Sequence, residues 1–430
     1  MKEEFLHYAW QYRLFVQDDL KTIDGESVTI VDVGQKNIDS GPDFFNAKII
    51  IGNTLWAGNV EIHLLASDWY QHSHQEDFCY DSVILHVVWR SDTIIHRHNG
   101  ESIPQLVLPI SDEILKRKGL LDLGGNWIRC EKFWQELNPQ FFDIQLSKIL
   151  YERLLRKGEE VLCLLELTKN DWEEVFYRVL LKSFGLHVNS LPFELLSKSL
   201  PLSYLRKHRN NLFQLEALLL GQASLLEAEN SDEYLKLLKR EYCFLSKKFN
   251  LVSIDRNLWK FSKMRPSNFP TIKIVQFASL LYQSDNFFSN LLSSVDIESI
   301  KQMFRTTPSD YWNTHYQFGK PSVYRPKQMG ENAINLLIIN AVIPILYAYA
   351  QQKENEELLE RTFSFLETLP AEQNSIVEGW KNLGVFVENS YRSQALIELK
   401  RQYCDLRKCL RCGIGHALLS SANSNDTATY

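Results

Sequence analysis

Three residues near the N-terminus combine types and spacing that suit metal-assisted hydrolysis. Asp43 follows Gly41-Pro42, while Glu61 and His63 stand two residues apart in a later apolar stretch. Alternate side chains of a strand project from the same face, so Glu61 and His63 are expected to share one. Paired carboxylates hold a hard divalent ion that acidifies a coordinated water, and an imidazole can orient or deprotonate that water. We therefore predict a Mg²⁺ or Mn²⁺ site on Asp43 and Glu61.

A second polar group follows closely in the sequence. Asp68, His72 and His74 lie between two predicted strands, and His86 lies within the second strand. His72 and His74 can reach one ion if the segment is extended, and with Asp68 they are the predicted substrate contacts. An alternative is a histidine-rich zinc or iron site of His72, His74, Asp77 and His86 acting on a small molecule. Taken alone, His86 on an apolar strand is expected to be a core histidine.

Three of the seven cysteines, Cys404, Cys409 and Cys412, lie together near the C-terminus. The two-residue gap between Cys409 and Cys412 lets both thiolates reach one ion, and His416 is predicted as the fourth ligand of a zinc site. An iron–sulfur cluster is disfavoured because it needs a fourth thiolate from a distant part of the chain. The alternative is a set of small buried residues around a helix end.

Composition limits the class of protein. The chain has 430 residues, 45% of them hydrophobic, which is enough for a large core, and a formal net charge of -6. Contact with DNA or RNA would therefore need a local basic groove. The apolar run 335–350 is too short to span a bilayer and is expected to be a buried helix, so no membrane association is predicted. An odd cysteine number and a polar N-terminus favour the cytoplasm.

Hydrophobic periodicity changes near residue 120. Residues 1–120 are predicted to form a mixed α/β sheet domain, 121–419 a helical domain with the cysteine and histidine cluster, and 420–430 a disordered tail, so the class is α+β. The predicted strands are 28–33, 44–51, 54–65, 82–89, 93–98 and 105–108, after a helix at 3–15. The predicted helices include 141–156, 172–184, 212–226, 232–249, 271–282, 332–349, 354–368 and 390–403.

Pro42-Asp43 followed by Glu61-Ile62-His63 resembles the motif of the PD-(D/E)XK nuclease superfamily. The order of one helix, three strands, a connection and a buried strand is also similar. The resemblance implies a restriction-endonuclease-like core in which Asp43 and Glu61 bind magnesium for phosphodiester cleavage.

The resemblance departs from the family pattern at the basic residue. His63 stands where the family has lysine, and Lys48 on the neighbouring strand is the predicted substitute for its positive charge. A further acid is expected from the first helix, at Glu3 or Glu4. With these residues, the sequence predicts a metal-dependent hydrolase, in the first instance a nuclease. The non-enzymatic alternative is a scaffold with a structural zinc.

Across its full length the chain also resembles a bacterial family defined only as a domain of unknown function. That resemblance implies the extent of the unit and no activity. It rests on Gly41-Pro42-Asp43, Gly58–His63, Ser67-Asp68-Trp69, Leu85–Val88, Arg265–Pro270, Ser393–Leu396 and the terminal cysteines.

Overall fold

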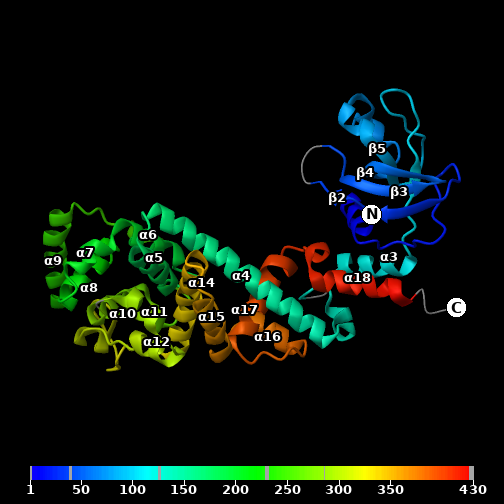
Figure 1. Cartoon of the computed structure of the whole chain (residues 1–430). Helices are drawn as coiled ribbons and strands as arrows, with labels where there is room; N and C mark the ends of the chain where they lie inside the picture. Colours follow the sequence, from blue (N-terminus) through cyan, green and yellow to red (C-terminus); the bar gives the residue numbers. More distant parts are fainter. Residues whose placement is uncertain (1, 38–40, 124–126, 228–231, 285, 426–430) are drawn as a thin grey trace. The chain divides into compact units, whose positions relative to one another are not determined.

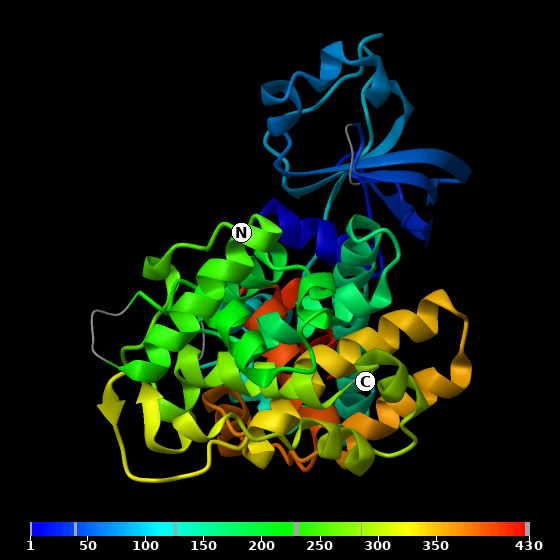
Figure 2. The same cartoon turned by 90° about the vertical axis from the view of Figure 1, so that its left-hand side faces the viewer.

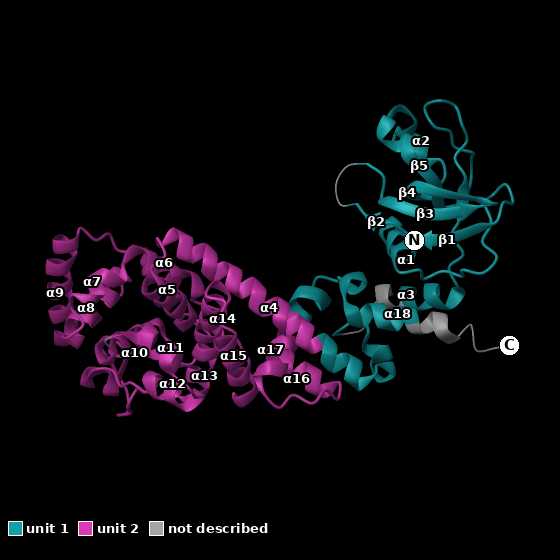
Figure 3. Cartoon of the chain, in the orientation of Figure 1, with its two compact units in different colours: residues 1–145, 399–430 teal, residues 146–398 magenta. Residues whose placement is uncertain are grey.

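The computed structural model describes residues 2–37, 41–123, 127–227, 232–284 and 286–425. It forms two compact units, one of residues 1–145 with 399–430 and one of residues 146–398 (Figure 3). The first unit holds the large sheet and the second is mostly helical, which confirms the predicted α+β class. The division differs from the predicted one because the C-terminal segment returns to the first unit.

A six-stranded mixed sheet forms the centre of the first unit (Figures 1 and 2). Its order is β1-β3-β4-β5-β6, with β2 paired to β3. β1–β3–β4 are antiparallel, whereas β5 runs parallel to β4 and β6 parallel to β5. The strands are β1 (Val28–Asp32), β2 (Gln35–Lys36), β3 (Phe44–Ile51), β4 (Thr54–Leu65), β5 (Val83–Arg90) and β6 (Gln105–Val107).

β3 and β4 have the predicted bounds because a turn sequence separates them. β3 and β4 form a hairpin in which Ile51 pairs with Thr54, and Gly52 adopts a φ of +60°, which glycine tolerates best. β5 is buried on both faces from Val83 to Val88, as its continuous apolar run indicates. Gly58 of β4 approaches β5 closely, since a Cβ there would lie 2.3 Å from Ile84.

Two elements of this unit differ from the predictions. The first helix α1 (Glu3–Gln11) ends earlier than residue 15, and Arg13 just beyond it has a left-handed φ of 53°. Residues 93–98 form no strand and contribute only an isolated bridge between His96 and Ser102. The remaining helices of the unit are α2 (Asp68–Gln71), α3 (Asp112–Leu123) and α18 (Gly413–Asn425).

The C-terminal helix α18 lies beside α3 (Figure 1). The Arg117 guanidinium donates a hydrogen bond to the Leu418 carbonyl at 3.2 Å and joins the two helices. The predicted disordered tail is therefore helical as far as Asn425, and residues 426–430 lie outside the described part of the chain.

The second unit is built from helices whose apolar faces pack together. α5 has the predicted bounds because Asp171 caps it, accepting hydrogen bonds from the backbone of Glu173 and Glu174. The helices are α4 (Pro139–Leu167, which begins in the first unit), α5 (Trp172–Phe184), α6 (Ser190–Ser199), α7 (Leu202–Arg206), α8 (Leu212–Gln222), α9 (Glu233–Phe249), α10 (Pro270–Gln283), α11 (Phe287–Ser293), α12 (Ile297–Phe304), α13 (Glu331–Leu337), α14 (Ile343–Gln352), α15 (Glu356–Thr368), α16 (Ser375–Asn382) and α17 (Ser390–Glu398), with a small hairpin of β7 (His315–Gln317) and β8 (Lys320–Pro321).

One helical stretch, Glu331–Gln352, contains the longest apolar run. Among the described residues it is the helix that has the length and composition to cross a membrane, and 78% of its apolar window is buried in the protein. It consists of α13, a π-helical turn at Ile338–Val342 and α14. This burial agrees with the prediction that the apolar run 335–350 forms a buried helix.

Candidate metal centre of the N-terminal sheet

The central strand β4 presents two ionisable side chains on one face. Glu61 and His63 are almost completely buried, with 5% and 1% of their surface exposed. Val60 and Ile62 fill the opposite face with apolar side chains. Because β4 pairs with β3 on one edge and β5 on the other, both groups are held on a strand that is fixed on both sides. Their face is buried rather than solvated.

Asp43, just before β3, joins β4 through two hydrogen bonds between a backbone N–H and a side-chain carboxylate. The Asp43 N–H donates to Glu61 Oε2 at 3.1 Å, and the Ile62 N–H donates to Asp43 Oδ2 at 2.9 Å. These bonds lie just beyond the pair of Phe44 and Val60, with which the β3–β4 ladder ends. The three residues central to the prediction, Asp43, Glu61 and His63, therefore meet in space.

Helix α1 adds an acid and a histidine to this face. His7 Nε2 lies 3.2 Å from Asp43 Oδ2 and 3.9 Å from Glu3 Oε1. Glu3 is thus the helix acid that the sequence predicts, whereas Glu4 is exposed to solvent. Sequence reasoning missed His7, although the four-residue spacing from Glu3 places both on one helix face.

The segment between β4 and β5 brings in two more histidines. It is not extended but folds as α2 followed by a short 3₁₀ turn, with Ser73 between them at a left-handed φ of 60°. This bend directs both neighbours toward β4: His72 Nδ1 lies 3.1 Å from His63 Nε2, and His74 Nε2 lies 3.3 Å from Glu61 Oε1.

Three imidazole nitrogens from these elements converge on one point, and the Glu61 carboxylate lies beside two of them. Glu61 Oε1 and His63 Nε2 are 3.5 Å apart, and one nitrogen each from His63, His72 and His74 lies within 4.8 Å of the others. A tetrahedral ion with bonds of about 2.0–2.1 Å places its ligand atoms about 3.3–3.4 Å apart. The separations of 3.1, 3.3 and 3.5 Å among these atoms match that spacing. The three histidines can hold one divalent ion, with the Glu61 carboxylate beside it.

A second layer of side chains fixes the ligand orientation. His86 Nε2 lies 2.9 Å from His63 Nδ1, so the other ring nitrogen of His63 faces the donor cluster. The His74 ring stacks on Tyr80 with centroids 3.8 Å apart, and the buried Trp69 packs edge-on against His74 and His86. Such partners hold a ligand histidine in one tautomer and one orientation.

The electrostatics of the cluster favour occupation by a cation. Burial, together with the charge of Asp43, raises the pKa of Glu61 to about 9. Burial and the neighbouring imidazoles lower the pKa of His63 to about 2, and burial lowers that of His86 to about 3. Neutral imidazoles are the form that binds metals, and a bound cation would restore the charge of the Glu61 carboxylate.

The comparisons with known proteins give a family without a described activity. Residues 3–375 match the model of a family described as "Protein of unknown function (DUF2851)". The chain belongs to this family. No curated protein and no solved structure matches it.

The DUF2851 match covers the residues of the candidate metal centre, from Glu3 to His86, and ends before Cys404. It confirms the predicted resemblance to a domain-of-unknown-function family. The resemblance to PD-(D/E)XK nucleases remains a prediction.

The donor set of this family member also bears on the choice of metal. Three imidazoles with one carboxylate suit first-row transition ions better than Mg²⁺, which prefers oxygen ligands. Asp43, predicted as a direct ligand, already accepts the Ile62 N–H and faces His7. The donors therefore favour Zn²⁺ or Mn²⁺ bound through His63, His72 and His74, with Glu61 and Asp43 beside the ion.

Removing the ion is expected to destabilise the first unit. A ligand at 100 times its Kd adds about 2.7 kcal/mol to the free energy of unfolding. We expect Zn²⁺ or Mn²⁺ to raise the melting temperature of chelator-treated protein, and His74→Ala to abolish most of that rise. The exposed His98 offers a matched control, since His98→Ala should keep the full shift. Equal shifts in both variants, measured by differential scanning fluorimetry, would contradict this site.

Three predicted residues have other positions or roles. Lys48 is exposed and pairs with Ala57, and its five-residue separation from Asp43 along β3 corresponds to roughly 16 Å of strand. The prediction that Lys48 supplies a charge at the site is therefore corrected. Asp68 accepts the Leu65 N–H at 2.9 Å and positions α2, while Asp77 caps the turn at Cys79 instead of joining the histidines.

The predicted Cys3His zinc site also changes. His416 Nδ1 lies 2.7 Å from the Tyr8 hydroxyl and His416 Nε2 lies 3.3 Å from the Ser420 hydroxyl, so both ring nitrogens have partners. His416 is therefore not available as the fourth ligand of the cysteines.

Proposed function

We propose that this protein is a metal-dependent hydrolase that cleaves phosphodiester bonds, as a nuclease does. The observation that carries the proposal is the convergence of Asp43, Glu61 and His63 with two further histidines at the spacing of ion ligands. A buried cluster of this kind has few structural uses, because burial of unpaired ionisable groups is costly. A catalytic ion would compensate for that cost.

The residues divide into ion ligands and groups that act on water and substrate. A bound ion would acidify a water and polarise a phosphate oxygen. Asp43 and His7, 3.2 Å apart, form a hydrogen-bonded pair beside the ligands. Burial lowers the pKa of His7, but the hydrogen bond and charge of Asp43 outweigh it, so the net shift is upward. We assign to His7 the positive charge that the sequence analysis sought in Lys48.

The order of elements supports the nuclease class over other hydrolases. A helix with an acid precedes three antiparallel strands, and a parallel strand follows a short connection, as the PD-(D/E)XK resemblance implies. Glu3, Asp43 and Glu61 then occupy the three acidic positions on α1, just before β3 and on β4. DNA or RNA remains the proposed partner, and the protein is proposed to act in the cytoplasm.

The grouping of His63, His72 and His74 supports a second candidate. Three imidazoles around one ion are typical of zinc hydrolases with small substrates. Under this proposal the same ion would act on a small phosphoester, and no nucleic-acid groove would be needed.

The two candidates differ in substrate, and one experiment separates them. Purified protein would be incubated with plasmid DNA, single-stranded DNA, RNA and bis(4-nitrophenyl) phosphate, each with Mg²⁺, Mn²⁺ or Zn²⁺. Cleavage of nucleic acid with Mn²⁺ or Zn²⁺ supports the nuclease proposal. Turnover of the small diester alone supports the second candidate. If protein with a bound ion hydrolyses none of these substrates, both proposals fail.

A further inference from the structure

The second unit carries a local excess of positive charge, although the net charge of the chain is -6. The excess lies on α9 and on α7 with the turn that follows it (Figure 1). Residues 202–211 contain three lysines and arginines and no acid, and residues 233–249 contain five with two acids. Phosphates are attracted by such a local basic surface, because the averaged charge of this chain would repel them.

Helix α9 has one buried face and one exposed face. Its buried face includes Leu235, Leu238 and Leu245, and a Cβ at Gly221 of α8 would lie 2.1 Å from the Tyr242 ring, so α8 and α9 pack closely. Exposed side chains recur on the opposite face at intervals of three or four residues: Lys236, Lys239, Arg240, Phe244, Lys247 and Lys248. The helix is thus fixed to the unit and presents its basic face to solvent.

An aromatic pair joins the end of α9 to α7. The Tyr204 ring stacks on the Phe249 ring with centroids 4.6 Å apart. The ammonium group of Lys207 lies 5.7 Å from the centre of the Tyr204 ring and 5.5 Å from that of Phe249, and the ammonium group of Lys248 lies 5.2 Å from the Phe249 centre. Because two lysines border the same ring, the positive charge continues from α9 onto α7.

The acids of these two helices leave most of this charge uncompensated. Glu233 pairs with Lys236 at 3.7 Å, and the Glu241 carboxylate accepts a hydrogen bond from the Gln214 amide at 2.7 Å. Within the described ranges, five exposed bases form no ion pair: Lys207, Lys239, Arg240, Lys247 and Lys248. They are free to contact an anionic partner.

We propose that these five bases, together with Phe244, form a surface that binds the phosphate backbone of single-stranded nucleic acid. The choice of a nucleic acid as the partner rests on the proposed function. Phe244 is 65% exposed and lies four residues after Arg240 on the same face. An exposed aromatic ring among bases is typical of single-strand binding, in which bases stack on the ring while cations contact the phosphates. From Lys236 to Lys248, α9 spans roughly 18 Å, enough for several successive phosphates.

An anionic lipid surface fits these helices less well. A helix that lies in a membrane interface inserts an apolar face between the lipids. The apolar face of α9 is instead buried within the unit, and its exposed large apolar side chains are Leu237 and Phe244, at 46% and 65% exposure. Two such side chains among bases suit base stacking and phosphate contacts better than insertion.

Fluorescence anisotropy of labelled oligothymidylate and oligouridylate tests this surface, with the full-length chain in chelator so that no cleavage occurs. Arg240→Glu combined with Lys248→Glu is expected to weaken binding by at least about tenfold and to reduce its dependence on salt. Lys353→Glu combined with Lys381→Glu is the matched control, since it makes the same change of charge at exposed positions elsewhere in the unit. Phe244→Ala should weaken binding by about fivefold or more with the salt dependence unchanged, because it removes stacking and no charge.

A chemical measurement on the unmodified protein supplements the variants. Bound oligothymidylate should slow the acetylation of Lys207, Lys247 and Lys248, followed by mass spectrometry, and should leave that of Lys353 unchanged. Three results would overturn the surface: no binding of either oligonucleotide, equal affinity in the charge-reversed variant and its control, or binding of phosphatidylserine vesicles in place of the oligonucleotides.

The binding test and the cleavage test can fail separately. Binding is measured without a metal ion, whereas cleavage requires one. Binding that depends on Arg240 and Lys248 in a protein that cleaves nothing would contradict the proposed function alone. Cleavage of nucleic acid with equal affinity in the charge-reversed variant and its control would contradict this surface alone.

Discussion

Replacing Glu61 by glutamine is expected to lower metal-dependent phosphodiester cleavage by at least about 10²-fold. Oε1 of this carboxylate lies within 3.5 Å of two ring nitrogens in the histidine cluster, those of His63 and His74. An amide of the same size keeps the shape of the site but removes the negative charge beside the ion. Initial rates with the best substrate and ion of the panel, together with metal content, measure the loss.

Two neighbouring acids of α1 provide the controls for this experiment. Glu3→Gln is expected to reduce activity because Glu3 faces His7, whereas Glu4→Gln should retain it because Glu4 is exposed. Full activity in Glu61→Gln, with the wild-type amount of metal, would rule out the proposed role of the carboxylate.

The loss of activity in Glu61→Gln should not result from unfolding. The pH dependence of the melting temperature of this variant tests this. In the metal-free protein the pKa of Glu61 is raised from 4.5 to about 9. A group whose folded-state pKa is raised binds protons more tightly in the folded state, so stability falls as the pH rises through this window. Glutamine does not titrate. At pH 8 the melting temperature of the metal-free variant should therefore be no lower than that of the metal-free wild type. The difference between the two melting temperatures should become smaller toward pH 5.

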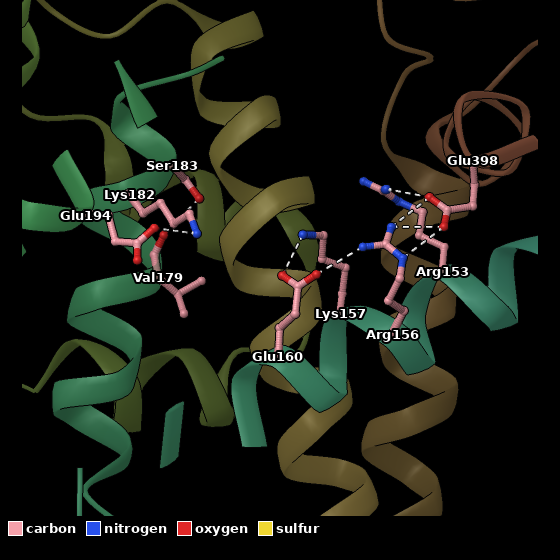
Figure 4. A network of polar contacts seen from close by, with 9 residues as sticks. All are labelled: Arg153, Arg156, Lys157, Glu160, Val179, Lys182, Ser183, Glu194 and Glu398. Carbon is pink, nitrogen blue, oxygen red and sulfur yellow. Dashed lines mark hydrogen bonds and ion pairs between the residues drawn. The ribbon is translucent and has the colours of Figure 1, made fainter. Parts of the chain in front are cut away.

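The second large effect is expected in the helical unit. Glu398→Ala should lower the free energy of unfolding by about 3–5 kcal/mol, because it leaves buried arginine charge without its partner. The Glu398 carboxylate, 4% exposed as a residue, accepts hydrogen bonds from Arg153 at 3.2 Å and from Arg156 at 2.9–3.1 Å (Figure 4). Burial lowers the pKa of Arg153, and Glu398 is the main group that opposes this shift.

Glu160 on the same network is a matched control for Glu398. It also accepts from Arg156, at 3.0 Å, and from Lys157, at 2.8 Å, but about half of its side chain is exposed (Figure 4). Exposed ion pairs contribute at most about 1 kcal/mol, so Glu160→Ala should cost far less. Urea unfolding followed by circular dichroism compares the two variants. Equal losses of stability would show that burial does not decide the strength of these ion pairs.

Local patterns in the sequence determined most of the elements that carry the site. The bounds of β3, β4 and α5 agree with the predictions because apolar alternation, a glycine turn and a capping aspartate are all encoded within a few residues. The same reasoning placed Glu61 and His63 on one face, since strand geometry fixes the direction of side chains two residues apart.

Only the tertiary structure decided which separated segments meet. His7, His72 and His74 reach β4 because α1 packs against the sheet and a left-handed residue bends the β4–β5 connection, and no local pattern specifies either contact. Lys48 shows the converse, since it is near Asp43 in sequence and yet lies far along the strand. Spacing determines the face on which a side chain lies, whereas long-range packing determines its partners.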